Sequence, residues 1–554
     1  MNVECLPITA LPHTTRLFRD YLDVSNAGAD SPMRRFYPMA PFGASPDRAE
    51  ANWMRSSMHS SRSHQEEIKK RNSLADLLLH QNLRWGAGSA ALANIEKLRS
   101  GADAVLTGQQ VGLFGGPLLT LLKAATAIRK AQNATAAGLP HVPVFWLATE
   151  DHDLAEVNNV ALPGKHELET LRIAVEDAAS AGSARPVGNL RLDASVAAAV
   201  ARLKDLLGHA PICDRIEAAY APGATMGDAF ARFIANVFAE QGLIVVDAST
   251  RGFHALGAAT LQAAIEDAEG LHLALLERNA ELEANGYHTQ VLVPEGGSLL
   301  FLLDQTTGAR HPLKRSGGAW KANGQSYSTG DLLSILAAEP ERLSPNALLR
   351  AVFQDTIFPT SAYIGGPAEI AYFAQSQVVY QRILGRTTPV LPRFSATLIE
   401  PALAKMMAQH ELSLPDVMES ADALAQKLGA RSMSAESKRR LADTANALDS
   451  ELAALTEWMQ SMDAGLGRSA EVSASKMLYQ MNRLRLMAAN HELQRNASLR
   501  KHADALTLHL FPDQKPQERV LGGVWFLARY GDDLAQLLVD HAEQDCPGHH
   551  VFFL

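Results

Sequence analysis

Four ionisable residues follow directly after an apolar segment, and their types and spacing could support acid–base chemistry. Residues 143–149 have the character of a buried strand, and Glu150, Asp151, His152 and Asp153 come next. Carboxylates on both sides of an imidazole favour its charged form, which suits His152 to proton transfer or to binding an ammonium group. Carboxylate and imidazole are also common metal ligands. The structural alternative is a solvated loop in which Asp153 caps the next helix.

A glycine-rich turn upstream has the composition of an anion-binding loop. Its candidate binding residues are Thr107, Gly108, Gln109, Gln110, Gly112, Gly115 and Gly116. Glycine permits positive φ and a close backbone approach, as a phosphate or carboxylate requires. Pro117 suits the first position of a helix, whose free N–H groups favour an anion. The turn matches neither the dinucleotide-binding nor the P-loop pattern. A tight strand-to-helix connection without a ligand is the alternative.

A third group of polar and glycine residues lies near another Gly-Pro pair. Its members are Gln354, Asp355, Tyr363, Gly365, Gly366 and Glu369. Gly366-Pro367 before a helix offers a second helix start that could accept an anion. Glu369 lies close to that helix start, where a carboxylate interacts well with the helix dipole. That interaction is also the structural explanation for Glu369.

The elements that must position these residues alternate between strand and helix. Apolar residues 104–106 precede the turn, residues 118–132 have helical spacing, and residues 225–240 form a second helix before an apolar strand at 243–247. This order predicts an α/β fold with a doubly wound parallel sheet, in which ligands bind at the carboxyl ends of the strands. Short β-like runs and glycine turns predict a β-rich insertion near residues 286–330.

Beyond about residue 395 the chain has an almost wholly helical pattern. We therefore expect a core over residues 1–395 and a helical domain over 396–554, with the C-terminal tail docked on the core. One heptad seam consists of Leu441, Ala445, Leu448, Leu452, Leu455, Met459 and Met462, and a second contains Met477, Met481, Leu484 and Ala488. Two such helices joined by the turn at 464–467 predict an antiparallel hairpin. The hairpin could pack on itself or form a dimerisation arm.

Composition narrows the class of protein. The chain has 554 residues and a net charge of −9, which argues against a nucleic-acid or acidic-membrane partner. Its three cysteines have no CxxC spacing, so they indicate neither a zinc site nor a disulfide framework. No signal peptide or membrane-spanning run is visible. We expect a cytoplasmic protein.

Three motifs resemble those of a known family. They are TGQQVGLFGGP at 107–117, VFWLATEDHD at 144–153 and YIGGPAEIAY at 363–372. Shorter similar stretches are Phe36-Tyr37, 243–247, Gln354-Asp355, 389–393 and 517–519. Together they resemble the bacillithiol biosynthesis cysteine-adding enzyme family over essentially the whole chain.

The resemblance implies a fold and a reaction. The fold is a Rossmann-like core similar to class I aminoacyl-tRNA synthetases, with an inserted connecting region and a helical coiled coil that pairs two subunits. The reaction is the last step of bacillithiol assembly, in which a ligase joins the carboxyl group of cysteine to the amine of a glucosaminyl-malate. The expected partners are therefore these two small molecules and a second copy of the chain.

Amide formation from a carboxylate needs activation, so ATP is the expected cofactor, and no metal is expected. We assign the glycine-rich turn as the anion cradle, with Gln109 and Gln110 on polar groups of the substrates. Glu150, Asp151 and Asp153 would hold an ammonium group, and His152 would act as general base. Lys123 is a weaker candidate, because a surface lysine is the default at its position two turns along the helix. The isolated histidines, His254 among them, are expected to be ordinary surface or core residues. Two alternatives are a metal-dependent hydrolase that uses the 150–153 cluster and a non-catalytic coiled-coil scaffold.

Overall fold

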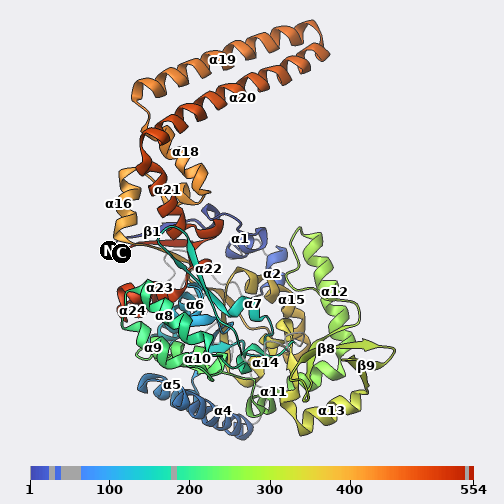
Figure 1. Ribbon diagram of the computed structural model, residues 1–554. Coiled ribbons are helices and arrows are strands. Elements are labelled where there is room, and N and C mark those ends of the chain that lie inside the picture. The colour runs from blue at the N-terminus through green and yellow to red at the C-terminus, as the bar shows by residue number, and fades with distance from the viewer. Residues whose placement is uncertain (1, 24–30, 39–63, 176–183, 543–547) are drawn as a thin grey trace.

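The computed structural model describes residues 2–23, 31–38, 64–175, 184–542 and 548–554 (Figure 1). Its centre is a five-stranded parallel sheet in the order β13-β12-β2-β3-β6. The strands are β2 (Asp103–Gln109), β3 (His141–Leu147), β6 (Ile244–Val246), β12 (Thr360–Gly365) and β13 (Val390–Pro392). The predicted Rossmann-like parallel core is confirmed.

Both faces of this sheet are covered by helices. Along β3, Phe145 and Leu147 face one hydrophobic core, whereas Val144 and Trp146 face the other. Alternate side chains of a strand point to opposite faces, so an apolar run buried on both sides is expected in a doubly wound sheet. The flanking helices are α4 (His64–Arg84), α5 (Ser89–Arg99), α6 (Leu119–Ala136), α10 (Met226–Val237), α11 (Arg251–Glu266), α14 (Ala347–Ile357) and α15 (Pro367–Leu384).

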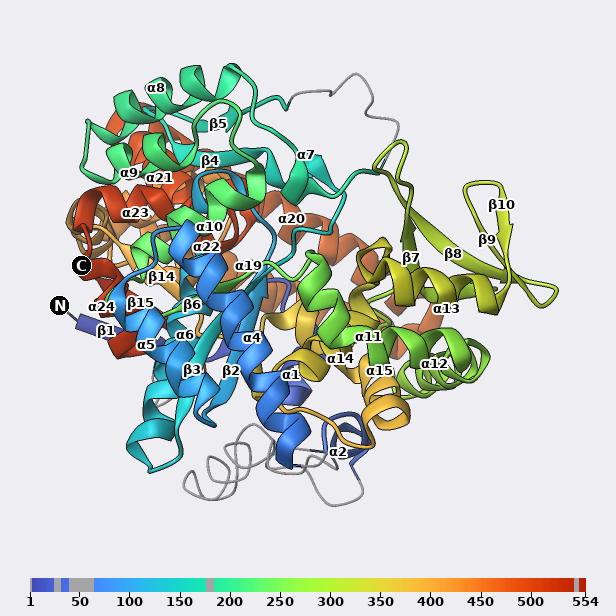
Figure 2. The ribbon, with the colours of Figure 1, turned by 90° about the horizontal axis from the view of Figure 1, so that it is seen from below.

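A second, antiparallel sheet forms the β-rich insertion, in the order β10-β9-β8-β7-β11 (Figure 2). Its strands are β7 (Gly297–Leu303), β8 (Arg310–Ser316), β9 (Ala319–Ala322), β10 (Gln325–Tyr327) and β11 (Leu343–Pro345), with α12 (Ala268–Ala284), α13 (Thr329–Ala338) and η5 (Pro340–Arg342) beside them. Residues 289–293 are not a strand. The side-chain oxygen of Gln375 accepts hydrogen bonds from the backbone N–H groups of Gln290 and Val291. It thus takes the place of the carbonyl groups that a neighbouring strand would offer.

The two ends of the chain meet in a small sheet. In the order β1-β15-β14, β1 (Asn2–Leu6) is antiparallel to β15 (His549–Phe553), which is parallel to β14 (Ala396–Ile399). Cys5 on β1 is disulfide-bonded, whereas Cys213 is a buried free thiol. The expectation that the cysteines form no disulfide is therefore wrong at Cys5. Disulfides are uncommon in a reducing cytosol, so the cytoplasmic location stays an expectation.

The helical domain carries a long arm that projects from the body (Figure 1). The arm consists of α19 (Ala435–Met462) and α20 (Ala464–Arg495). Only Asp463 separates the helices, and its carboxylate caps α20 by accepting from Gly465 N and Leu466 N. The predicted turn at 464–467 is therefore the first turn of α20. The predicted coiled-coil hairpin is confirmed, and no described helix has the length and apolar character that crossing a membrane requires.

The remaining elements connect these layers. They are η1 (Ile8–Ala10), α1 (Arg16–Leu22), α2 (Pro32–Phe36), η2 (Leu113–Gly115), α7 (Leu154–Val157), β4 (Asn159–Pro163), β5 (Leu168–Arg172), η4 (Val187–Asn189), α8 (Ser195–Leu207), α9 (Ile212–Ala219), α16 (Pro401–Gln409), α17 (Leu414–Val417), α18 (Ala421–Ser432), α21 (Ala497–Leu510), η6 (Pro512–Gln514), α22 (Gln517–Val520), α23 (Gly523–Tyr530) and α24 (Asp533–His541).

Candidate active site

Polar residues gather where the parallel strands end. Gln109 ends β2, Glu150 follows β3, Asp247 follows β6, and Arg393 follows β13. Carboxyl ends of parallel strands lie at one edge of a sheet, where α/β proteins bind their ligands. Two of these strand ends are joined by a hydrogen bond, in which Oγ1 of Thr149 donates to Oδ1 of Asp247 at 2.6 Å.

Glu150 forms an ion pair with a fully buried histidine on α11. Nε2 of His254, whose side chain is 0% exposed, lies 3.1 Å from Oε1 of Glu150. Burial lowers the pKa of His254, but the adjacent carboxylate outweighs burial and the net pKa is raised. Burial raises the pKa of Glu150, but the charge of His254 outweighs it and the net pKa is lowered. Glu150 is therefore an ionised carboxylate at neutral pH.

Two arginines lie near this pair. Arg310 from β8 and Arg350 from α14 both lower the pKa of Glu150 through their positive charge. Nε of Arg310 donates to Oγ of Ser344 at 2.7 Å, and Nη2 of Arg350 donates to the Tyr372 hydroxyl at 2.6 Å. The cluster thus combines a negative charge with cations supplied by the insertion and by the core.

Gln109 and Gln110 have amides with opposite roles. Nζ of Lys123 donates to Oε1 of Gln109 at 3.0 Å, so the amide nitrogen of Gln109 keeps its donors. Nε2 of Gln110 donates to Oδ2 of Asp151 at 2.7 Å and to Oε2 of Glu156 at 2.6 Å. Its amide oxygen remains an acceptor. At the end of β2, Gln109 therefore presents an amide N–H group as donor, and Gln110 presents an amide oxygen as acceptor.

Lys123 is a buried cation, not the surface lysine expected from the sequence. It is 2% exposed because α6 packs this face against the sheet. Its Nζ lies 2.5 Å from Oε2 of Glu369 and also donates to the carbonyl of Gly108. Burial lowers the pKa of Lys123. The lysine joins the end of β2 to the start of α15.

The carboxylate of Glu369 caps the start of α15. Its Oε2 accepts from Gly366 N at 2.8 Å, and its Oε1 accepts from the Tyr363 hydroxyl at 2.6 Å. A Cβ at Gly365 would lie 3.1 Å from Cγ2 of Val390, so Gly365 is tightly packed. An internal carboxylate caps this helix start, so the structure gives no support to an anion at Gly365 and Gly366, and their binding role stays a prediction.

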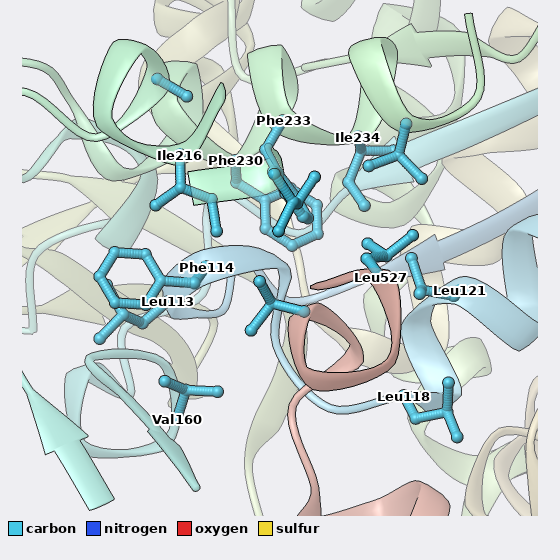
Figure 3. Close-up of a cluster of buried hydrophobic side chains, with 14 of the residues drawn as sticks. Leu113, Phe114, Leu118, Leu121, Val160, Ile216, Phe230, Phe233, Ile234 and Leu527 are labelled. Atoms are coloured by element: carbon cyan, nitrogen blue, oxygen red, sulfur yellow. The ribbon is translucent and has the colours of Figure 1, made fainter. Parts of the chain in front are cut away.

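The glycine-rich turn is part of the hydrophobic core. Leu113 and Phe114 point into a cluster with Ile216, Phe230 and Phe233 (Figure 3). A Cβ at Gly115, which has φ +89°, would lie 2.2 Å from Cε1 of Phe233.

Protein groups also use the polar atoms of the turn. Gly115 N donates to the Tyr220 hydroxyl, which donates to the carbonyl of Gly112. The carbonyl of Gly116 accepts from Gly523 N, and Leu118 N donates to the carbonyl of Leu521. The structure gives no support to an anion cradle at Gly112, Gly115 and Gly116, because α23 and its preceding residues cover the start of α6. The binding role of these glycines stays a prediction.

Two further residues of that prediction are structural. Oγ1 of Thr107 donates to the carbonyl of Ile364 at 3.0 Å and so fixes β2 to β12. A Cβ at Gly108 would lie 2.9 Å from the carbonyl oxygen of Trp146, so the residue permits close packing of β2 on β3. Only Gln109 and Gln110 of the predicted turn reach the polar cluster.

Asp355 lies at the opposite edge of the sheet. Its Oδ2 accepts from the Tyr380 hydroxyl at 2.9 Å, and it contacts Thr360, the first residue of β12, and Thr388, which precedes β13. Burial raises its pKa. Its neighbour Gln354 is fully buried and donates to Asp355 at 3.4 Å. The structure does not bring this pair to the site, because α14 runs back along the sheet toward the amino ends.

His152 and Asp153, two other members of the 150–153 cluster, do not contact the Glu150–His254 pair. The imidazole of His152 is 44% exposed, with Nδ1 3.8 Å from Oδ1 of Asp151. Oδ1 of Asp153 accepts from Glu156 N at 3.3 Å and so caps α7. No group of three or more His, Cys, Asp or Glu side chains in the described ranges could hold a metal ion. The geometry therefore gives no specific support to the metal-dependent hydrolase.

A pocket of about 660 Å³ adjoins the cluster at Arg393. Its polar lining includes Ser395, Lys515, Glu518 and Arg519, beside Pro367 at the start of α15. Arg393 forms a buried bidentate pair with Glu518, one contact being 3.0 Å from Nη1 to Oε2. Lys515 and Arg519 are exposed to the pocket. They contribute two positive charges to this wall, which also contains the exposed carboxylate of Asp513.

Comparison with known families identifies the chain. Residues 1–394 match the model "Bacillithiol biosynthesis BshC, N-terminal Rossmann-like domain", and residues 396–554 match "Bacillithiol biosynthesis BshC, C-terminal coiled-coil domain". The chain belongs to the BshC family.

Curated BshC relatives match over most of their length. A protein of Koribacter versatilis is 41% identical over 100% of this chain and 99% of its own, and one of Solibacter usitatus is 36% identical over the same shares. A third, from Salinibacter ruber, is 31% identical over 87% of this chain and 88% of its own. Each carries the name "Putative cysteine ligase BshC".

Sequence reasoning underrated one charged residue of this BshC-family site, Lys123, and missed three others. These are His254, Arg310 and Arg350, which are isolated in the sequence, so that no local spacing connects them to a motif. A lysine within the apolar face of 118–132 was an available signal, since unpaired buried lysines are rare. No comparable signal marked the other three.

Proposed function

We propose that the protein is a cysteine ligase that joins the carboxyl group of cysteine to the amine of a glucosaminyl-malate in bacillithiol biosynthesis. The names of the BshC relatives and the match over both domains support this reaction. The observation that carries the proposal is the ion pair of Glu150 and buried His254 at the carboxyl edge of the sheet. It fixes a negative charge where an amine substrate needs one.

Glu150 holds the acceptor amine in this proposal. Its lowered pKa makes it a weak base at neutral pH but a permanent partner for an ammonium group. Asp151 adds a second negative charge beside it and is itself held by Gln110. The donor on Gln109 and the acceptor on Gln110 would bind hydroxyl or amide groups of the substrates.

His152 removes the proton that the amine must lose. Its imidazole is exposed at the edge of the cluster and has Asp151 as a neighbour. A general base at this position contributes about 10²–10⁴-fold to rate. The proton leaves the ammonium group, and the neutral amine then attacks the activated carbonyl carbon of cysteine, forming the amide bond and releasing the activating group.

ATP is the proposed activating cofactor, and it would make the cysteine carboxylate an acylating agent. The glycine-rich turn does not fit a nucleotide, because protein atoms use its polar groups and fill its space. The pocket beside Arg393 fits better. Its volume lies in the usual range for small ligands, roughly 300–1,000 Å³, and Lys515 and Arg519 offer charges for phosphates.

A homodimer through the arm is the proposed assembly. Apolar side chains one heptad apart are exposed on both helices, at Leu455 and Met462 on α19 and at Met477 and Leu484 on α20. A second arm could cover them as in a four-helix bundle. Leu455→Glu with Leu484→Glu should halve the mass measured by light scattering, whereas the exposed Ser473→Glu should not.

An assay with one component omitted in turn tests the ligase reaction. Purified protein, cysteine, glucosaminyl-malate and ATP should give the amide product by mass detection, and each omission should abolish it. If product forms without ATP, ATP is rejected as the cofactor, but the ligase function stands. No product under any condition, with intact protein, would reject the ligase function and favour the scaffold.

A further inference from the structure

Arg310 is a buried cation without an ion-pair partner. It is 8% exposed, and its guanidinium stacks over the Phe301 ring at 3.9 Å. Nε donates to Ser344, and Nη2 donates to the carbonyl of Pro345 at 2.5 Å. These neutral contacts fix the plane of the guanidinium. Within the described residues, no carboxylate forms an ion pair with it, although Glu150 and Asp151 influence it from a greater distance.

Arg350 is a second cation near Glu150, and its side chain is partly exposed. Its Nη2 donates to the Tyr372 hydroxyl at 2.6 Å, and it interacts with Tyr363. It too forms no ion pair with a carboxylate of the described chain. An arginine has five N–H donors, and a charge withdrawn from water costs several kcal/mol unless a partner compensates it. Both guanidiniums therefore have donors left for an anionic ligand.

We propose that Arg310 and Arg350 bind the two carboxylates of the acceptor's malyl group, while the nearby Glu150 holds the acceptor's ammonium group. This inference rests on the proposed ligase function. In a glucosaminyl-malate the amine is on C2 of the sugar and the malyl group is on the neighbouring C1 oxygen. One positive group thus lies next to two negative ones, and the site offers the complementary set of one carboxylate and two guanidiniums.

The carboxylate of cysteine is the less suitable ligand for these arginines. It loses its charge when the amide forms, and a bidentate guanidinium would occupy the oxygens that activation needs. The malyl carboxylates keep their charge throughout the reaction. Planar guanidiniums suit such permanent carboxylates because they bind them with two parallel hydrogen bonds. The β-rich insertion, which carries Arg310, then has a specific role as one wall of the acceptor site.

The test measures binding without turnover. Calorimetric titration of the full-length protein with L-malate should show binding that Arg310→Met and Arg350→Met each weaken at least tenfold, about 1.4 kcal/mol. Acetate, with one carboxylate, and phosphate should bind at least tenfold more weakly than malate. Arg315→Met is the matched control. It lies on the same strand, and its guanidinium pairs with exposed Glu269.

Steady-state kinetics provide the second readout. The KM for glucosaminyl-malate should rise at least tenfold in the arginine variants, while the KM for cysteine changes less than twofold. Arg310→Lys keeps the positive charge but lacks the planar pair of N–H donors of a guanidinium. It serves as the test variant if Arg310→Met fails to fold. It should give an intermediate effect. Unchanged malate binding in both variants would overturn the proposal, and so would a rise in KM confined to cysteine. Malate binding without any turnover would reject the ligase function and leave the dicarboxylate site standing.

Discussion

The glycine-rich turn at 112–117 and the acidic end of β3 at 150–153 have similar chemical promise in the sequence, but their surroundings in the fold differ. The turn is buried against Phe233 and Tyr220, and its backbone groups bond to protein atoms. The acidic end keeps Glu150 charged beside His254, with cations nearby. Glycines and backbone N–H groups make an anion site only when no other part of the protein fills the space beside them or accepts their hydrogen bonds.

Buried charge distinguishes the two regions better than composition does. The turn contains no ionisable residue, whereas the strand ends contain Lys123, Glu150 and His254, all held by specific partners. Desolvated charges are costly, so a fold retains them in pairs or where a ligand completes them. The contrast predicts that changes in the turn alter folding, whereas changes at the strand ends alter turnover.

Replacing His152 should have the largest effect on turnover. His152→Gln should lower kcat by about 10²–10⁴-fold, because the amine would lose its proton acceptor. The melting temperature should hardly change, since the side chain is half-exposed. In a plot of initial rate against pH from 5 to 9, the fall in rate caused by protonation of the general base should also disappear. Full activity in a folded His152→Gln protein would reject the assignment.

Adding one methyl group in the turn should affect folding most. Gly115→Ala should cost about 2–5 kcal/mol of unfolding free energy, from the clash with Phe233 and the positive φ. Urea denaturation measures this. Gly86→Ala is the matched control, because φ is +74° and no atom lies within 4 Å of the new Cβ. It should cost only about 1–2 kcal/mol. Equal losses in the two variants would show that packing against Phe233 does not matter.

The Glu150–His254 pair should make stability depend on pH. The raised pKa of His254 gives stability that is fully present below its ordinary value of 6.5 and is lost as the pH rises through the folded value. The lowered pKa of Glu150 gives stability present above 4.5 and lost as the pH falls through its folded value. Glu150→Gln should therefore cost most, about 1–3 kcal/mol, between pH 4.5 and 6.5. A cost independent of pH would contradict the pairing.

The smallest effects are expected at two acids that do not contact the Glu150–His254 pair. Asp153→Asn keeps a side chain that caps α7 equally well, so rate and stability should stay within twofold and about 0.5 kcal/mol. Asp355→Asn lies at the amino edge of the sheet and should leave both KM values unchanged. A large loss of rate in either variant would extend the site beyond the strand ends described here.

The sequence predicted the parts of the fold that depend on local pattern. Strands β2, β3 and β6, helix α10 and the arm follow from apolar periodicity, which the residues themselves carry. It also predicted Glu150, Asp151, Gln109 and Gln110 at the site, because they directly follow or end a strand. It could not predict His254, Arg310 or Arg350, whose positions depend on tertiary packing. It misplaced Asp355 because helix direction decides which sheet edge a residue reaches.

The central claim is that the polar cluster at the strand ends binds the acceptor amine for cysteine ligation. The most direct test is kcat/KM for glucosaminyl-malate in Glu150→Gln, measured by mass detection of the amide at neutral pH. Removing a charge-assisted contact of about 1.5–3 kcal/mol should lower this value by roughly 10–150-fold. The protein should remain folded, and the KM for cysteine should be unchanged. A folded Glu150→Gln enzyme with wild-type kcat/KM for the acceptor would contradict the account.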